Sequence, residues 1–459
     1  MHLLLSTALA LPQYAQRSGR TCANCHVSPT LEDPEGWENP ELKDRKCTLH
    51  CESCHTDPMG GGQRNASGRY YAQSTAGMFH TQDRSYTDHD RELFGDDAMW
   101  KVQEFLGEHA DVEEGDRRIP SDEEEWAAGV GGDQRGGRLA WGKPLGEPAT
   151  MQLWDGRYDD LNADPMLSVG GDVRISYWTG TDRVFPMQAD LHTTFHPVHH
   201  LSLVSTISAR GRSAGGVYKP PIYNRRLYVM AHELPYMAWA KAGIFQPGFG
   251  QYLDDHTRYP RAMFEQDLDS SDDTVLGAEI GAAPNYPYLS ASVFANDTSW
   301  LDGGDPDQGW GLALNGGLRE LAWTATGHVM IKQRGAAGRG DLYAGGVTWA
   351  LNPFAWSNQV PLTFTGEVSG GVRVIEGKQT PMLAATTQMD WLLRNGVNAR
   401  VTADQAVSDF GSPLLRQRYG LGLDLTPIPG ITVSTTGRRS WEGAHAAGND
   451  LMVTTHFYF

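Results

Sequence analysis

The sequence predicts an all-β protein whose main part is an antiparallel β-barrel of about 16 strands. Apolar and polar residues alternate over most of residues 165–459, which is the period of a strand with one apolar and one polar face. The alternating segments are roughly ten residues long, enough for a tilted strand to cross a bilayer. The chain also contains 53 Gly, 14 Trp and 17 Tyr, a composition typical of such barrels.

Two stretches illustrate the alternation. The first, Met187–His196, places Gln188, Asp190, His192, Thr194 and His196 on its polar face. The second, Leu415–Leu425, places Tyr419, Leu421, Leu423 and Leu425 on its apolar face. Turn-forming sequences separate such stretches, at Asn352-Pro353, Asn395-Gly396 and Pro427-Ile428-Pro429-Gly430.

The end of the chain favours a membrane barrel over a soluble β-sandwich. Alternating residues continue to an aromatic C-terminus, through Leu451, Val453, Thr455, Phe457 and Phe459. A soluble β-protein usually lets its last residues fray. No run of 18 apolar residues predicts a transmembrane helix. We therefore expect the barrel to lie in the outer membrane of a Gram-negative bacterium, in contact with its lipid.

Three further regions precede the barrel. Residues 1–15 contain a short apolar run with small residues at which a secretory signal peptide can be cleaved. Residues 16–82 hold all five Cys. Residues 83–164 form an acidic linker, within which Asp96–Ala110 has the apolar spacing of a short helix. The net charge of −18 makes nucleic acid an unlikely partner, because phosphate binding needs a basic patch.

The strongest chemical signal is a repeated C-x-x-C-H motif. It occurs at Cys22, Cys25 and His26, and again at Cys51, Cys54 and His55. Two thiols at this spacing can form thioethers with the two vinyl groups of one haem, and the adjacent His then ligates the iron. The sequence therefore predicts a dihaem cytochrome c segment over residues 16–82, with two covalent haems c.

Other readings of these cysteines are weaker. Two C-x-x-C pairs can hold a zinc ion, but zinc does not require a His after each pair. A thioredoxin-like redox pair would need a βαβ pattern, which the surrounding sequence lacks. The remaining thiol, Cys47, is interpreted as a free buried cysteine.

Each haem iron also needs a distal ligand. The candidates chosen are His50 for the first haem and His80 or His89 for the second, with Met59, Met78 and His109 as other options. The two irons would then form a relay. The glycine-rich run at residues 60–62 would let the backbone approach a haem, and Arg64 or Arg69 could pair with its propionates.

Two polar clusters stand out in the barrel region. Leu253–Arg258 reads either as an ordinary loop or as a pore-lining or metal-binding cluster. His192 and His196 share the polar, lumen-facing side of one strand, where they could contact the N-terminal segment or bind a metal ion. A simple polar lumen remains the alternative for both histidines.

Around the first motif, from Ala15 to His26, the chain resembles the fused cytochrome–porins, outer-membrane proteins best known from iron-oxidising bacteria. The resemblance implies a small N-terminal c-type cytochrome joined to a porin of about sixteen strands, with Cys22, Cys25 and His26 as haem-attachment residues. The second motif, from Cys51 to His55, is a departure, since those members carry one haem. This departure leaves the electron donor or acceptor open.

These observations together predict electron transfer across the outer membrane, between an extracellular donor or acceptor, iron being one candidate, and periplasmic c-type cytochromes. Whether the chain is also an oxidoreductase acting on extracellular metal stays open. The first alternative is a solute porin whose haem segment is a redox-active plug or docking module. The second is a haem enzyme such as a dihaem peroxidase, which would need an open coordination position on one iron.

Overall fold

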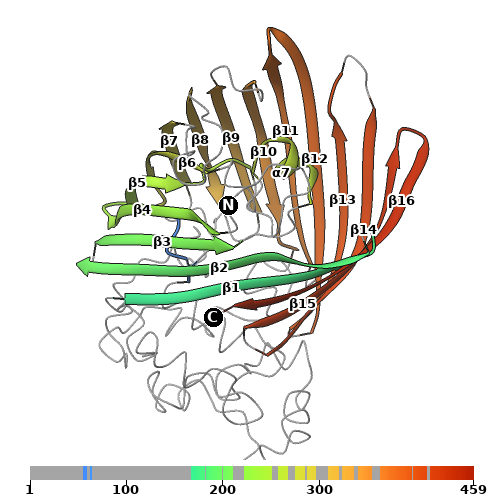
Figure 1. Ribbon diagram of the computed structural model, residues 1–459, viewed down its shortest axis with the longest axis horizontal. Coiled ribbons are helices and arrows are strands. Elements are labelled where there is room, and N and C mark those ends of the chain that lie inside the picture. The colour runs from blue at the N-terminus through green and yellow to red at the C-terminus, as the bar shows by residue number, and fades with distance from the viewer. Residues whose placement is uncertain are drawn as a thin grey trace, which may run out of the picture.

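The computed structural model of the chain describes residues 55–58, 63–64 and 167–458, apart from loop gaps at 181, 199, 210–221, 251–256, 267–273, 285–286, 296–308, 320–322, 335–339, 354–361, 395, 411–413 and 429. The described part forms sixteen strands and one short helix (Figure 1). The strands are β1 (Leu167–Trp178), β2 (Arg183–Val198), β3 (Leu201–Ala209), β4 (Ile222–Leu234), β5 (Ala238–Phe245), β6 (Val275–Ala282), β7 (Pro287–Ala295), β8 (Gly309–Arg319), β9 (Trp323–Arg334), β10 (Asp341–Leu351), β11 (Leu362–Ile375), β12 (Lys378–Arg394), β13 (Val397–Val407), β14 (Leu415–Ile428), β15 (Ile431–Glu442) and β16 (His445–Tyr458). The helix is α7 (Tyr259–Met263).

The sixteen strands close into one antiparallel barrel. Each strand pairs with its neighbours in sequence, and β1 pairs with β16 to complete the ring (Figure 1). The closing register runs from Asp172 opposite Tyr458 to Trp178 opposite Met452. The predicted strand number and antiparallel topology are confirmed.

The barrel is apolar on the outside and polar on the inside. Along β1, Val173, Ile175 and Tyr177 are 38%, 42% and 36% exposed, whereas Asp172, Arg174 and Ser176 between them are at most 8% exposed. A water-soluble protein would place these two sets the other way round. An apolar outer surface on a closed barrel is the arrangement that a bilayer requires, so the chain is a membrane-spanning β-barrel of the outer-membrane type.

The loops distinguish the two ends of the barrel. At the end where β1 begins, the turns are mostly short, as at 199–200, 235–237 and 395–396. The opposite end carries the long connections 210–221, 246–274 and 296–308. Short turns face the periplasm and long loops face outward in barrels of this class. The barrel therefore starts from its periplasmic end.

The two alternating stretches lie where the sequence placed them. In β2, Leu191 is exposed, while His192 and Thr194 are buried on the inner face. In β14, Leu421 is 69% exposed and Arg418 is buried. One turn differs from its prediction, because β14 continues to Ile428, which pairs with Ile431 past an irregularity in the register. The turn is therefore confined to residues 429–430.

The described residues contain no helix long and apolar enough to cross a bilayer. Several predictions concern residues that lie outside the described part: the signal peptide 1–15, the linker 83–164 with its helix Asp96–Ala110, the ligands Cys22, Cys25, His26, Cys51 and Cys54, the distal candidates His50, His80, His89, Met59, Met78 and His109, the residues Cys47, 60–62 and Arg69, the run 253–256, and Phe459.

Candidate functional site in the barrel lumen

A small segment from the second C-x-x-C-H motif lies against the inner wall of the barrel. His55 and Arg64 form an antiparallel bridge. The backbone N–H of Thr56 donates to the carbonyl oxygen of Gln63 at 3.0 Å, and the Thr56 hydroxyl donates to the same oxygen at 3.2 Å. We call residues 55–58 and 63–64 the N-terminal hairpin. It is the blue segment in Figure 1, and it contacts β4 through Asp57.

One end of the hairpin is held by the wall at β4 and β5. The Tyr228 hydroxyl donates to Oδ2 of Asp57 at 3.1 Å, and Nζ of Lys241 donates to Oδ1 at 3.5 Å. Nε of Arg226 forms an ion pair with Oδ2 at 3.6 Å. Asp57 is only 3% exposed. A carboxylate is thus removed from water and compensated by two cations of the barrel wall.

The other end of the hairpin lies across the seam of the barrel, where β1 pairs with β16. Gln63 accepts a hydrogen bond from the Thr194 hydroxyl of β2. The Arg64 guanidinium lies 4.3 Å from the ring centroid of Tyr458 in β16, a cation–π distance. The hairpin therefore spans the inner wall from β4 and β5, past β2, to β16.

The imidazole of His55 lies in a buried environment beside the positive charge of Arg64. The residue is half-buried, and burial, reinforced by the Arg64 charge, lowers the pKa of its imidazole to about 4. The ring is therefore neutral at pH 7, and neutral imidazole is the form that binds metals. In the part of the chain that the structure describes, Nδ1 of His55 is inaccessible to water and has no hydrogen-bond partner. A neutral imidazole is the form that an iron at this motif would require.

A carboxylate between two histidines lies at the same seam. Nε2 of His192 is 2.8 Å from Oδ2 of Asp172, and Nε2 of His456 is 2.6 Å from Oδ1. Nδ1 of His192 contacts the Thr206 hydroxyl at 3.0 Å, so both ring nitrogens of His192 are engaged. Among the described residues, no group of three or more His, Cys, Asp and Glu is arranged to hold a metal ion. His192 is thus buried on the polar inner face and hydrogen-bonded there through both ring nitrogens.

His196 also faces the lumen, as predicted. Its Nδ1 is 2.9 Å from the Ser202 hydroxyl, which lies 2.7 Å from Nε2 of His232. Three adjacent strands, β2, β3 and β4, thus join through one hydroxyl near the periplasmic end. The sequence did not predict His232 as a partner, because β4 is separated from β2 by an intervening strand.

The described parts of the connection between β5 and β6, residues 246–250 and 257–266, fold into the barrel rather than away from it. Phe249 and Phe264, 6% and 0% exposed, pack within a buried apolar cluster that includes Met330 and Leu342 on the inner wall. The helix α7 contacts β11, β12 and β13. We call the described residues 246–250 and 257–266 the inward loop. The interpretation of Leu253–Arg258 as an ordinary loop is wrong for Arg258, because this side chain is buried in the lumen.

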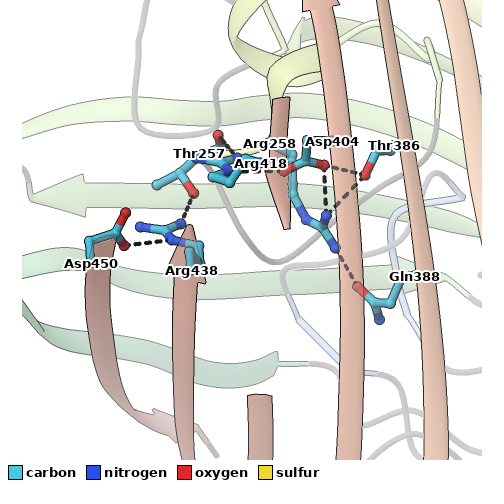
Figure 2. Close-up of polar contacts among 8 residues, drawn as sticks. All are labelled: Thr257, Arg258, Thr386, Gln388, Asp404, Arg418, Arg438 and Asp450. Atoms are coloured by element: carbon cyan, nitrogen blue, oxygen red, sulfur yellow. Dashed lines mark hydrogen bonds and ion pairs between the residues drawn. The ribbon is translucent and has the colours of Figure 1, made fainter. Parts of the chain in front are cut away.

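Arg258 joins the inward loop to the far wall. Its Nη1 donates to Oδ1 of Asp404 at 2.7 Å and to the Thr386 hydroxyl at 3.0 Å, and its Nη2 donates to Oε1 of Gln388 at 2.8 Å. Figure 2 shows these bonds, with Thr257 reaching the wall beside them. Arg418 and Arg438 lie on either side of Thr257 and pair with wall carboxylates, Asp404 at 2.7 Å and Asp450 at 2.7 Å.

A second ionic contact follows α7. Glu265 is surrounded by three basic side chains of the wall, with Nζ of Lys332 at 3.3 Å, Nη1 of Arg334 at 2.6 Å and Nη1 of Arg373 at 2.8 Å. Burial alone would raise the pKa of this carboxyl, but the three cations outweigh burial and hold the pKa well below its usual range. The loop is thus fixed to the wall by opposite charges at both ends of α7.

The sequence missed most of these lumen contacts. One indication in the sequence was Lys241, the single charged residue of β5, Ala-Trp-Ala-Lys-Ala-Gly-Ile-Phe, at an inward position. Asp57 was another, since it follows the second motif by two residues. Their pairing joins residues 184 apart in sequence, and no local pattern indicates it.

Comparison with known families finds no matching family model, and a search among curated proteins finds no match. Similar solved structures are outer-membrane barrels. A loop-deleted OmpT of Vibrio cholerae has a TM-score of 0.49 at 9% identity, covering 64% of this chain and 99% of its own. An anion-selective porin from Comamonas acidovorans has 0.46 at 9%, covering 64% and 99%. The channel DcaP of Acinetobacter baumannii has 0.44 at 11%, covering 64% and 97%. What the strands of this chain themselves show is a closed antiparallel barrel of sixteen strands.

Proposed function

We propose that this protein transfers electrons across the outer membrane of a Gram-negative bacterium, through covalently bound haem c held inside a porin-like barrel. The partners would be an extracellular donor or acceptor, iron being one candidate, and periplasmic c-type cytochromes. The observation that carries the proposal is the position of His55. His55, which would ligate the iron at the second C-x-x-C-H motif, lies against the inner wall near the charges of Asp172 and Arg226.

The physical argument rests on the insulation that a bilayer provides. The hydrocarbon layer around such a barrel is roughly 25 Å thick, and a soluble cytochrome cannot enter it. A haem supplies one-electron chemistry when bound. The residues of this chain would hold it: Cys51 and Cys54 by thioether bonds, and His55 as an axial ligand. The contacts of Asp57, Gln63 and Arg64 with the wall keep that ligand inside the barrel.

A second candidate is a solute porin whose haem segment is a redox-active plug or a docking module. The inward loop favours it, because this loop enters the lumen and is fixed there through Arg258 and Glu265, and it would restrict which solutes pass. Both candidates use the same barrel. They differ in whether electrons or solutes cross it.

Proteoliposomes distinguish the two candidates. Purified, haem-loaded protein is inserted into vesicles with a reductant outside and an electron-accepting dye trapped inside. We expect dye reduction with the unaltered chain and with Cys47→Ala, which removes the cysteine outside both motifs. The double variant C51A/C54A, checked for barrel folding by circular dichroism, is expected to lose it. Absence of dye reduction by the unaltered chain would overturn the proposal. Swelling of the same vesicles in sugars or small anions would support the porin instead.

A further inference from the structure

We propose that Arg226, Tyr228 and Lys241 form a carboxylate-binding site on the inner wall, whose resident ligand is the side chain of Asp57. The site acts as the anchor that sets the depth of the second C-x-x-C-H motif in the barrel. The inference goes beyond the proposed function, because it concerns how the wall recognises the N-terminal hairpin and does not depend on haem. We call these three wall residues the carboxylate site.

The carboxylate site engages both oxygens of its ligand from two neighbouring strands. Lys241 of β5 donates to Oδ1, whereas Tyr228 and Arg226 of β4 approach Oδ2. Tyr228 is 1% exposed, and the Lys241 side chain is fully buried. Hydrogen bonds and ion pairs are stronger in such a dry environment than at a surface, so the site discriminates between a carboxylate and a neutral group.

The charge of the wall explains why an anion is required. Nζ of Lys241 lies 3.0 Å from Oε1 of Glu279 in β6. Glu279 is itself fixed, since Nε1 of Trp239 donates to Oε1 at 3.0 Å and the Ser292 hydroxyl donates to Oε2 at 2.8 Å. The wall thus supplies two positive charges, on Lys241 and Arg226, and one negative charge, on Glu279. The carboxylate of Asp57 brings this buried group of four charges to neutrality.

Wall residues other than Asp57 also hold the Lys241 ammonium group of the carboxylate site. Nζ of Lys241 lies 4.7 Å from the ring centroid of Phe245 and 5.4 Å from that of Tyr228. These rings and Glu279 restrict the ammonium group to one position. A preorganised site loses little side-chain entropy on binding, so a single carboxylate can be held firmly.

The anchor acts on the motif through a short and stiff connection. Asp57 follows His55 by two residues, and the intervening Thr56 is tied to Gln63 by two hydrogen bonds. Asp57 therefore positions His55 without touching it. The expected consequence is that loss of the carboxylate frees the hairpin while leaving the barrel closed.

Hydrogen exchange on the full-length protein in detergent tests the anchor. In Asp57→Ala we expect the Thr56 amide to exchange at least about tenfold faster, since its bond to Gln63 would open more often. Tyr228→Phe, a milder change that removes one donor, is expected to shift the same amide in the same direction by less. Asp424→Asn is the matched control, because it removes a lumen carboxylate paired with Arg400 on the opposite wall, and Thr56 should be unaffected.

Chemical rescue tests the ligand class. Sodium formate should raise the melting temperature of Asp57→Ala above that in sodium chloride of equal ionic strength, because formate can occupy the vacated carboxylate site. The unaltered protein and Asp57→Ala combined with Lys241→Met should show no such difference. Unchanged Thr56 exchange in both Asp57→Ala and Tyr228→Phe would overturn the proposal, as would equal acceleration in Asp424→Asn. None of these readouts measures haem or electron transfer, so failure here is distinct from failure of the proposed function.

Discussion

Arg258→Met is the sharpest perturbation of the inward loop. The Arg258 side chain is 2% exposed, as is that of Asp404, and its guanidinium makes hydrogen bonds to Asp404, Thr386 and Gln388. Removing one partner of a buried pair typically costs about 3–5 kcal/mol. Asp404 keeps Arg418, at 2.7 and 3.0 Å, so it is not left unpaired. We therefore expect the lower end of that range, about 3 kcal/mol.

The cost should appear as local opening of the loop. Phe249 and Phe264 still hold the rest of the loop in the apolar cluster. About 3 kcal/mol corresponds to roughly a hundredfold change in an equilibrium constant. The amide of Ala262, which donates to the carbonyl of Arg258 at 3.2 Å, should exchange faster by up to that factor. Arg225→Met, which breaks the buried wall pair between Arg225 of β4 and Asp190 of β2, is the control. Unchanged exchange at Ala262 in a folded Arg258→Met protein would refute the reasoning.

Three further predictions concern the loop and the lipid face. The folded pKa of Glu265 is depressed below its ordinary value of 4.5, so the stabilisation from this carboxylate is fully present above pH 4.5 and is lost as the pH falls toward the folded pKa. The noise of the single-channel current should therefore rise only in that acid range. Glu265→Gln should remove this pH dependence. Gly250→Ala places a Cβ 2.7 Å from Oε1 of Glu367 at a φ of +65°, so it should lower stability in urea by about 1–2 kcal/mol, whereas Gly437→Ala, with open space around it, should not. Leu421→Arg, on the lipid face, should cost about 2–4 kcal/mol if it lies near the bilayer midplane, measured by folding into vesicles.

The sequence predicted the barrel because its determinants are local. A period of two assigns every side chain of a strand to one face, so Leu191 and Leu421 could be placed outside and His192 and Arg418 inside before any pairing was known. Sixteen strands followed from counting such segments. The sequence predicted a turn over residues 427–430. The turn covers only residues 429–430, because Pro427 and Ile428 extend β14 past a break in its register.

The contents of the lumen could not be predicted in the same way. Arg258 binds Asp404 across 146 residues, and Tyr228 binds Asp57 across 171. The sequence near Arg258 and Asp57 drew attention to these two residues but did not indicate their partners, which only closure of the barrel brings close. The C-x-x-C-H motifs name a chemistry from spacing alone, but they do not say where in a barrel that chemistry resides. Asp57 and its wall partners show where His55, the last residue of the second motif, lies.

The most direct test of the account is the haem content of the purified chain. A pyridine haemochrome spectrum, combined with quantitative amino-acid analysis, gives the number of covalent haems per polypeptide. The account predicts two for the unaltered protein, and one for C51A/C54A. The account is contradicted if the protein carries no covalent haem after purification from cells competent in cytochrome c maturation. The remaining candidate would then be a solute porin with the inward loop in its lumen.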